Sequence, residues 1–295
     1  MWKNFSELKT QLKAGEPKTL VVAAAHDPYI LQAVFHAADV LPMRYVLLGD
    51  KWRMMDVARN IGRELDEAAI MHIEEDKQCL RAALEIMRAG KGHALMRGAI
   101  GRARFLSLMQ SCADAEHTLS SLALLEIPAY QKPIAVTDVT IYETPSLPEK
   151  TAILQNAARL YRRAGENPPK IAAVVPFEDE PGHTAITNDV VALASLNDKG
   201  AFGECLLDGP MPLEAALNMD AAAGEGVYGE VSGDADILLM PGLAAGAFFC
   251  KALSFFGGAK LAGCVLGAAG PIVWPTKSAS LEEALRSIVL CLGTA

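Results

Sequence analysis

The segment that most limits the fold is residues 232–277, which read SGDADILLMPGLAAGAFFCKALSFFGGAKLAGCVLGAAGPIVWPTK. Two short apolar runs, residues 237–240 and 261–266, are bounded by Asp, Gly and Pro, as is typical of parallel strands covered on both faces. A helix rich in small residues is expected between them. Ligands of open α/β sheets bind outside the carboxyl ends of such strands. We therefore expect residues 241–246 and 267–277 to border a site.

Strand-like apolar runs alternate with helical patterns along the chain. The predicted strands are residues 19–25, 44–49, 170–175, 205–207, 237–240 and 261–266, each followed by a candidate helix. This alternation predicts an α/β protein built mostly on parallel sheet. Residues 122–138 differ, because their two apolar runs are joined by a segment with Pro128 and Pro133 at its ends. That segment favours a turn, so we predict an antiparallel hairpin there.

The length of 295 residues is ample for two domains with real cores. A hinge is expected at residues 137–145, ahead of a long predicted helix at 148–164. We expect a first α/β domain of residues 1–132 plus 271–295 and a second of residues 133–270. The chemistry is expected in a cleft between these two lobes.

The composition argues against several classes of protein. A net charge of −8 and a pI near 5.3 disfavour a nucleic-acid partner, since phosphate neutralisation needs clustered Lys and Arg. Residues 1–15 have the pattern of an amphipathic helix and not of a signal peptide, and the longest apolar run is too broken to cross a membrane. The six scattered cysteines form no CxxC pair, as expected for reduced thiols in a cytoplasmic protein.

Several motifs that mark common enzyme classes are missing from the sequence. Residues 25–28 read AHDP after the first predicted strand, where a dinucleotide-binding fold would carry GxGxxG. No GxxxxGK[ST] P-loop and no GxSxG elbow occurs. No His or Cys cluster has the spacing of zinc ligands, so no metal site is expected.

The sharpest candidate site is the turn before the last predicted helix. Thr276, Lys277 and Glu283 supply a hydroxyl, a cation and a carboxylate near the start of that helix. Free N–H groups and the positive end of the helix dipole suit a phosphate or thioester oxygen there. A structural interpretation is equally open, with Ser280 as N-cap and Glu283 as the N3 residue of a capping box.

Carboxylates also follow other predicted strands. Thr137 and Asp138 end one apolar run, and Asp208 ends another. Such residues often line the site of an α/β protein, but Asp is also a routine turn or cap residue. For residues 233–236, which read GDAD, a turn is the favoured interpretation.

Short motifs between residues 94 and 273 carry a family resemblance. They are ALMRG at 94–98, EIP at 126–128, VTD at 136–138, Glu149-Lys150, Thr187, Asp189, DGP at 208–210, GDADILL at 233–239, Lys251, GAK at 258–260 and PIV at 271–273. In order and spacing the chain resembles the phosphate acetyl/butyryltransferases, and the butyryl branch more closely.

The resemblance implies a two-lobed α/β/α fold similar to the isocitrate and isopropylmalate dehydrogenases, with coenzyme A (CoA) in the cleft. It implies transfer of a short or medium acyl group from acyl-CoA to inorganic phosphate, by direct attack within a ternary complex. CoA or acyl-CoA and phosphate are then the substrates, and no permanently bound cofactor is expected. A homodimer or larger homo-oligomer is also implied, for which the apolar helix at 281–292 could serve.

The resemblance also implies roles for individual residues. Glu283 falls where the family places its base, Thr276 and Lys277 replace a usual Ser-Arg pair, and Arg97 and Arg102 are expected to bind anions. The other residues expected to bind substrate are Ser121, Thr137, Asp138, Tyr142, Asp208, Pro241, Gly246 and Pro271.

Several polar positions differ from the family pattern. Ser121 stands in place of a usual His and Tyr142 in place of a usual Asn. These changes leave an alternative function open, in which a diverged paralogue binds CoA or acyl-CoA without phosphate transfer.

Overall fold

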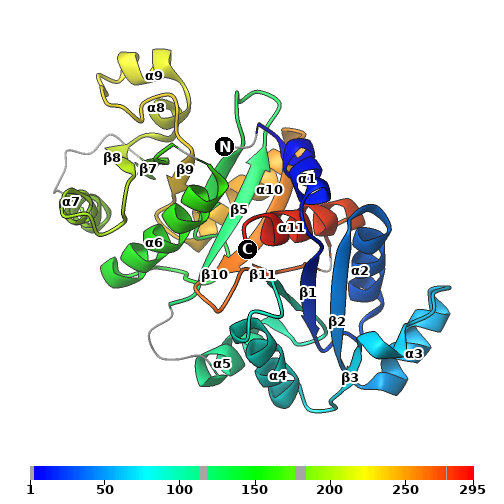
Figure 1. Ribbon diagram of the computed structural model, residues 1–295. Coiled ribbons are helices and arrows are strands. Elements are labelled where there is room, and N and C mark those ends of the chain that lie inside the picture. Colours follow the sequence, from blue (N-terminus) through cyan, green and yellow to red (C-terminus); the bar gives the residue numbers. More distant parts are fainter. Residues whose placement is uncertain (1–2, 113–117, 166, 177–183, 277) are drawn as a thin grey trace. The chain divides into compact units, whose positions relative to one another are not determined.

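The computed structural model describes residues 3–112, 118–165, 167–176, 184–276 and 278–295 (Figure 1). The chain forms two compact units. The first, here the outer unit, comprises Phe5–His117 and Ala262–Ala295; the second, here the central unit, comprises Thr118–Leu261 together with Met1–Asn4. The expected domain division at residues 132 and 270 stays a prediction, as does the expected cleft.

The sheet of the outer unit is largely parallel. Its strand order is β3-β2-β1-β4-β11-β10. The strands are β1 (Lys18–Ala23), β2 (Met43–Gly49), β3 (Ile70–His72), β4 (Ala94–Arg97), β10 (Lys260–Leu266) and β11 (Ile272–Val273). The helices are α1 (Phe5–Ala14), α2 (Pro28–Val40), α3 (Lys51–Asn60), α4 (Asp76–Arg88), α5 (Arg102–Cys112) and α11 (Leu281–Gly293), with a 3₁₀ turn at Glu67–Ala69.

The central unit has the strand order β5-β6-β9-β7-β8. The strands are β5 (Ser120–Glu126), β6 (Ile134–Thr137), β7 (Lys170–Val174), β8 (Leu206–Met211) and β9 (Ile237–Leu239). The helices are α6 (Leu147–Ala164), α7 (Ala185–Asp198), α8 (Leu213–Leu217), α9 (Met219–Gly224) and α10 (Leu243–Phe256). β6, β9, β7 and β8 are parallel, and β5 runs antiparallel to β6. The predicted α/β class, the mostly parallel sheet and the hairpin are therefore confirmed.

Two local expectations were wrong. β10 was expected to be a parallel strand, but it pairs antiparallel with β11, with Cys264 opposite Val273. The connection between them spans only residues 267–271, too short for the crossover that a parallel pair requires. Asp208 was expected to end a strand, yet it lies inside β8, opposite Ala172 of β7.

Apolar burial explains why the main strands form where they do. β1 reads KTLVVA, and every residue after Lys18 is buried, as expected for a parallel strand covered on both faces. α11 contributes eight buried residues and packs against α1 and α2. Its apolar face therefore belongs to the core of its own unit, which leaves little apolar surface for contact with another copy.

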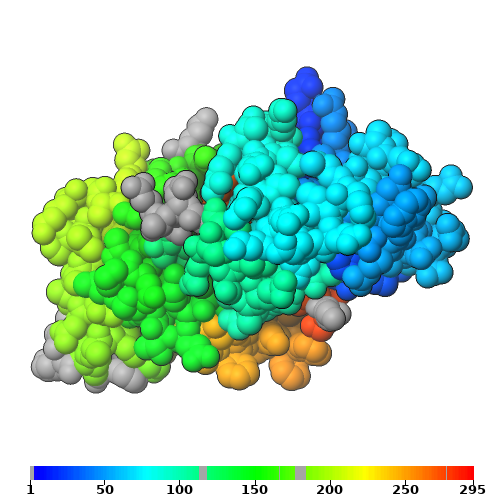
Figure 2. Space-filling view, turned by 90° about the horizontal axis from the view of Figure 1, so that it is seen from below, coloured from blue at the N-terminus to red at the C-terminus, as the bar shows by residue number. Residues whose placement is uncertain are grey.

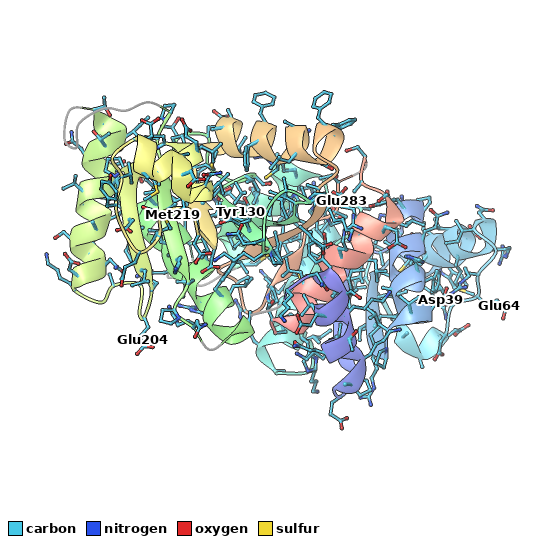
Figure 3. All side chains as sticks on the ribbon, turned by 90° about the horizontal axis from the view of Figure 1, so that it is seen from above. Asp39, Glu64, Tyr130, Glu204, Met219 and Glu283 are labelled. Atoms are coloured by element: carbon cyan, nitrogen blue, oxygen red, sulfur yellow. The ribbon has the colours of Figure 1, made fainter. Side chains whose placement is uncertain are left out.

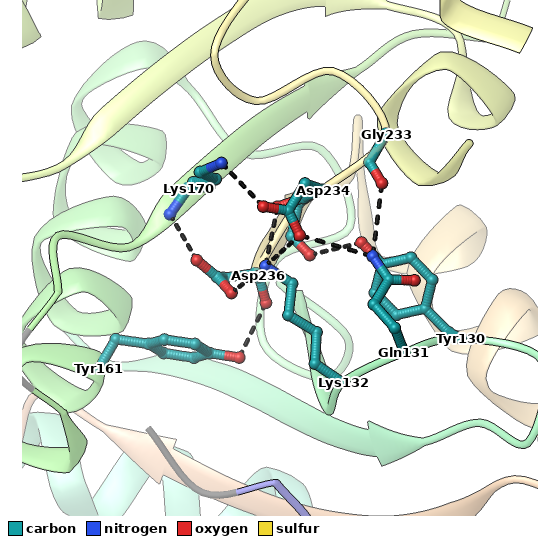
Figure 4. Close-up of polar contacts among 9 residues, drawn as sticks. Tyr130, Gln131, Lys132, Tyr161, Lys170, Gly233, Asp234 and Asp236 are labelled. Carbon is teal, nitrogen blue, oxygen red and sulfur yellow. Dashed lines mark hydrogen bonds and ion pairs between the residues drawn. The ribbon is translucent and has the colours of Figure 1, made fainter. Parts of the chain in front are cut away.

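An ionic network lies at the amino-terminal ends of β7 and β9 (Figure 4). Lys132 Nζ lies 2.9 Å from Asp234 Oδ1 and 2.6 Å from Asp236 Oδ1, and Lys170 Nζ lies 2.8 Å from Asp234 Oδ2. The Tyr161 hydroxyl donates to the backbone carbonyl of Asp236 at 2.8 Å. The two aspartates thus join neighbouring chain segments ahead of the strands, which supports the structural interpretation of the GDAD turn.

Within the described part of the chain, no helix has the length and apolarity that crossing a membrane requires.

Candidate active site

In the outer unit, three chain segments leave the carboxyl ends of the parallel strands β1, β4 and β11. Residues 24–27 follow β1, residues 98–101 follow β4, and residues 274–276 follow β11. Since β1, β4 and β11 are parallel, these segments leave the same edge of the sheet. This is the edge at which open α/β folds bind ligands.

Arg97, the last residue of β4, connects two of these segments. Its Nη1 donates to the carbonyl of Ile100 at 2.6 Å, and its Nη2 donates to the carbonyl of Pro275 at 2.8 Å. The guanidinium also lies 4.8 Å from the ring centroid of Trp274. These contacts hold the chain immediately before Thr276. The structure therefore supports a positioning role for Arg97, whereas its role in anion binding stays a prediction.

The first turn of α11 carries Glu283 (Figure 3). Ser280 is the N-cap, and its side chain accepts from the backbone N–H of Glu283 at 3.1 Å, so the predicted cap is confirmed. The backbone carbonyl of Thr276 accepts from the amide of Ala279 at 3.0 Å, which folds the turn that leads into the helix. Burial raises the pKa of the Glu283 carboxyl, and the charge of Arg286 partly opposes this.

Tyr29 and Asp27 belong to the same group of residues, and the sequence analysis missed both. The Tyr29 hydroxyl donates to the carbonyl of Ser280 at 3.4 Å. Burial raises the pKa of Tyr29, and the carboxylates of Glu283 and Asp27 add to this effect. Asp27 also caps α2 by accepting from the amide of Ile30. Their position directly after the first strand was the available signal, because strand ends of this kind line ligand sites.

The central unit has its own cluster where β6 ends. Asp138 is buried, and its carboxylate accepts from the amides of Thr140 at 2.7 Å and Ile141 at 2.8 Å. The hydroxyl and amide of Ser121 also donate to it, and the Thr137 hydroxyl donates to the carbonyl of Ser121 at 2.7 Å. Burial raises the pKa of Asp138, while these hydrogen bonds act in the opposite direction. The three predicted residues Ser121, Thr137 and Asp138 therefore meet, and their role in substrate binding stays a prediction.

The amino-terminal half of α10 packs against the loop that follows Asp138. A Cβ added to Gly246 would lie 3.0 Å from the carbonyl oxygen of Asp138, and one added to Gly242 would lie 2.6 Å from that of Glu143. The amide of Leu243 donates to the carbonyl of Tyr142 at 3.3 Å. Glycine is therefore required for this close approach, which brings Tyr142 and Gly246 into one region. Pro241 enters the same region, two residues after β9 ends.

Two other predicted residues, Asp208 and Pro271, lie apart from these clusters. Asp208 accepts from the amide of Val231 at 3.1 Å and lies three strands away from β6, about 14 Å at the usual strand spacing. Pro271 is buried and precedes β11, whereas Thr276 follows that strand, so the two lie at opposite ends of it. Arg102 is an exposed residue at the start of α5. Lys277 lies outside the described residues.

The arrangement in the outer unit suits proton transfer near an anion. A half-buried carboxyl with a raised pKa, Glu283, holds a proton closer to neutral pH than an ordinary carboxyl does. It lies in the first turn of a helix, where free N–H groups favour bound oxyanions. Thr276, which carries a hydroxyl, is an exposed residue seven positions earlier in the chain.

A family model described as "Phosphate acetyl/butaryl transferase" matches residues 77–292. The match covers more than half of the chain and includes the end of β4, the strands of the central unit and the turn that carries Glu283. The chain therefore belongs to the phosphate acetyl/butyryl transferase family, and the resemblance seen in its motifs is confirmed.

Individual relatives agree with this assignment. A phosphate butyryltransferase from Clostridium acetobutylicum is 31% identical over 296 residues, which cover 98% of this chain and 97% of the relative. A branched-chain phosphotransacylase from Enterococcus faecalis aligns with a TM-score of 0.78 and 25% identity, covering 94% of this chain and 99% of that one. A 4-hydroxythreonine-4-phosphate dehydrogenase from Klebsiella pneumoniae shares the fold alone. It aligns with a TM-score of 0.60 and 16% identity, covering 94% of this chain and 99% of that one.

Proposed function

We propose that this protein transfers an acyl group between CoA and inorganic phosphate, so that acyl-CoA and phosphate give acyl phosphate and free CoA. Its membership of the phosphate acetyl/butyryl transferase family supports this reaction. The structural observation that carries the proposal is Glu283, a carboxyl of raised pKa in the first turn of α11. CoA acts here as a substrate and not as a resident cofactor.

The reaction exchanges one bond for another at the acyl carbon. A phosphate oxygen attacks the thioester carbonyl, a carbon–oxygen bond forms, and the carbon–sulfur bond breaks. The departing thiolate takes a proton from Glu283, and in the reverse direction Glu283 takes the proton of the CoA thiol. Because a free thiol has a pKa of about 8.5, a positioned base is needed to make the thiolate at neutral pH.

The remaining residues would bind and orient the reactants. Lys277 and the exposed Thr276 would hold phosphate or the developing oxyanion, and each such donor can be worth about 3–4 kcal/mol in the transition state. Arg97 would fix the chain before Thr276 through its bond to Pro275. Orientation of two bound reactants then supplies much of the rate, since direct transfer needs no covalent enzyme intermediate.

The acyl group is proposed to be short or medium in length. Relatives bear the names phosphate butyryltransferase and branched-chain phosphotransacylase, and these names favour a chain of about four carbons over acetate.

The test is release of free CoA thiol from acetyl-, propionyl-, butyryl-, isobutyryl- and octanoyl-CoA, each with and without phosphate. We expect release that requires phosphate and is fastest with butyryl- or isobutyryl-CoA. Absence of phosphate-dependent release from every thioester, in a folded protein that still binds CoA by calorimetry, would refute the proposal.

A further inference from the structure

Two helices of the outer unit, α2 and α11, begin after strands of its sheet end. α2 starts at Pro28, after β1, and α11 starts at Leu281, after β11. β1 and β11 lie on either side of β4, so they are about 10 Å apart at the usual strand spacing. The two helices pack against each other, as Figure 1 shows. Seen from below in Figure 2, orange-red atoms of the carboxyl-terminal segment reach the surface beside blue atoms of the amino-terminal part.

Tyr29 connects the first turns of these two helices. Its hydroxyl donates to the backbone carbonyl of Ser280 at 3.4 Å. Ser280 is the N-cap of α11, and its own hydroxyl oxygen accepts from the amide of Glu283 at 3.1 Å. Ser280 thus links the Tyr29 hydroxyl to the backbone of Glu283. Asp27, the N-cap of α2, fixes the turn that carries Tyr29 by accepting from the amide of Ile30 at 3.2 Å.

The side chains of Tyr29 and Glu283 also lie near each other. Tyr29 is half-buried, and the negative charge of Glu283 contributes to the raised pKa of its hydroxyl. A charge acts in this way only over a short range, because salt screens it beyond about 10 Å. Burial is the largest influence on the pKa of Glu283 and raises it. A large aromatic ring beside the carboxyl displaces water from it and so contributes to that burial.

Exclusion of water matters for a carboxyl that exchanges protons near neutral pH. An ordinary Glu carboxyl has a pKa of about 4.3 and is only about 0.2% protonated at pH 7. Such a group is a weak base and is rarely available as an acid. General acid–base catalysis is most effective when the pKa of the group lies near the working pH. The surroundings of Glu283 therefore affect how well it can serve the proposed reaction.

We propose that Tyr29 is a positioning residue for Glu283: its hydroxyl fixes the turn that carries the carboxyl, and its ring shields that carboxyl from water. This inference rests on the proposed acyl transfer, in which Glu283 gives and takes the thiol proton. Tyr29 touches none of the reacting atoms and acts only through Glu283. Because the ring and the hydroxyl have separate effects, they can be removed one at a time.

Two variants and a control separate the effect of the ring from that of the hydroxyl. Tyr29→Phe keeps the ring and loses the bond to Ser280, so kcat/KM for thioester formation from butyryl phosphate and CoA should fall about two- to tenfold at pH 7. Tyr29→Ala loses both, and kcat/KM should fall further, toward the loss caused by Glu283→Gln. His36→Gln removes another contact from α2 to the first turn of α11, the exposed pair with Glu282, and should keep kcat/KM within about twofold.

The pH dependence distinguishes an effect on the carboxyl from a general loss of structure. The pH profile of kcat/KM reports the ionisation of groups in the free enzyme. In Tyr29→Ala, water returns to Glu283 and its pKa falls toward the ordinary value, so the rate should persist to lower pH than in wild type. Tyr29→Phe should keep the acid limb of wild type. A disturbed fold would instead lower the rate equally at every pH.

A double-mutant cycle tests whether Tyr29 acts through Glu283. In the Glu283→Gln background, Tyr29→Ala should lose no more than about twofold, because two residues that act as a unit are not additive. Full additivity, or an acid limb of Tyr29→Ala at the same pH as in wild type, would overturn the proposal. Circular dichroism checks that each variant is folded. Tyr29→Gln, which also removes the ring, replaces Tyr29→Ala if that variant does not fold.

Direct titration separates this inference from the proposed reaction. In protein whose glutamate carboxyl carbons carry an NMR-active isotope, the resonance that is missing from Glu283→Gln belongs to Glu283. Its pKa should be lower in Tyr29→Ala than in wild type, and close to the wild-type value in Tyr29→Phe. Equal pKa values in all three proteins would overturn the inference even where acyl transfer is observed. A lowered pKa in Tyr29→Ala, with no acyl transfer by wild type, would refute the proposed function and leave the effect of Tyr29 on Glu283 standing.

Discussion

Replacement of the Glu283 carboxyl by an amide should slow the reaction in a pH-dependent way. In the direction of acyl-CoA synthesis, the base must remove the thiol proton of CoA. At pH 7 a thiol of pKa 8.5 is only about 3% ionised, so a base that supplies the thiolate is worth up to about 30-fold. Proton transfer within the transition state can extend this to about 10²–10⁴-fold. We expect Glu283→Gln to lose about 30- to 1,000-fold in kcat/KM at pH 7.

The loss should shrink as the pH rises. At pH 8.5 about half of the thiol ionises without help, so the part due to thiolate supply falls to about twofold. The assay is the rate of thioester formation from butyryl phosphate and CoA, measured between pH 6.5 and 9. Wild type should keep its rate toward lower pH until Glu283, whose pKa burial raises, becomes protonated.

Folding should be unaffected by this substitution. The bond from the amide of residue 283 to Ser280 Oγ involves the backbone and survives. The pKa of Glu283 is raised in the folded state, so the folded protein loses stability as the pH rises through that pKa and the carboxyl ionises. A neutral Gln removes this loss. Thermal unfolding at pH 7 should therefore occur no earlier in the variant than in wild type.

Glu282 provides a matched control one residue away. Its side chain is 63% exposed and pairs with His36 at 2.9 Å, an exposed contact worth less than about 1 kcal/mol. Glu282→Gln should keep kcat/KM within about twofold. The reasoning fails if Glu283→Gln keeps more than a third of wild-type activity at pH 7, or if its deficit is the same at pH 7 and 8.5.

Two further predictions concern stability. Burial alone would raise the pKa of Asp234, but hydrogen bonds and charges from Lys132 and Lys170 lower it to about 2. A shift of this size would be worth about 2.4 kcal/mol of folding free energy. Because the Asp234 side chain is 41% exposed, solvent screening reduces this to about 1 kcal/mol. Since the pKa of Asp234 is lower in the folded than in the unfolded state, this stabilisation is present above about pH 4 and lost toward pH 2. Urea unfolding at pH 7 should show the loss for Asp234→Asn but not for the exposed control Glu204→Gln. Equal unfolding curves for the two variants would contradict this prediction. Gly246→Ala should lower the free energy of unfolding in urea by about 1–2 kcal/mol, because the added methyl would lie 3.0 Å from the carbonyl oxygen of Asp138. Gly224→Ala is the control and should cost nothing, since a Cβ there meets open space. An unchanged stability of the Gly246 variant would refute the packing argument.

Local features of this protein were predictable from its sequence because they depend on residues close together in the chain. The cap of α11 needs only Ser280 and the amide three residues on, and the β5–β6 hairpin needs only two apolar runs and a turn. The alternation of strands and helices predicted the α/β class, and short motifs in a fixed order carried the family. Glu283 was identified in the same way, and its role in catalysis stays a prediction.

Contacts between segments far apart in the chain decided which site residues meet and which helix faces are buried. Tyr29 reaches Ser280 across 251 positions and Arg97 reaches Pro275 across 178, and nothing local to either residue indicates its partner. α10 carries apolar residues all around its axis and few polar ones, so periodicity could not show that Phe255 faces solvent while Cys250 is buried. The helix cap, the hairpin and the class of fold were thus determined by the sequence alone. Which strand pairs with which, and which apolar face remains uncovered, was decided only when the chain packed.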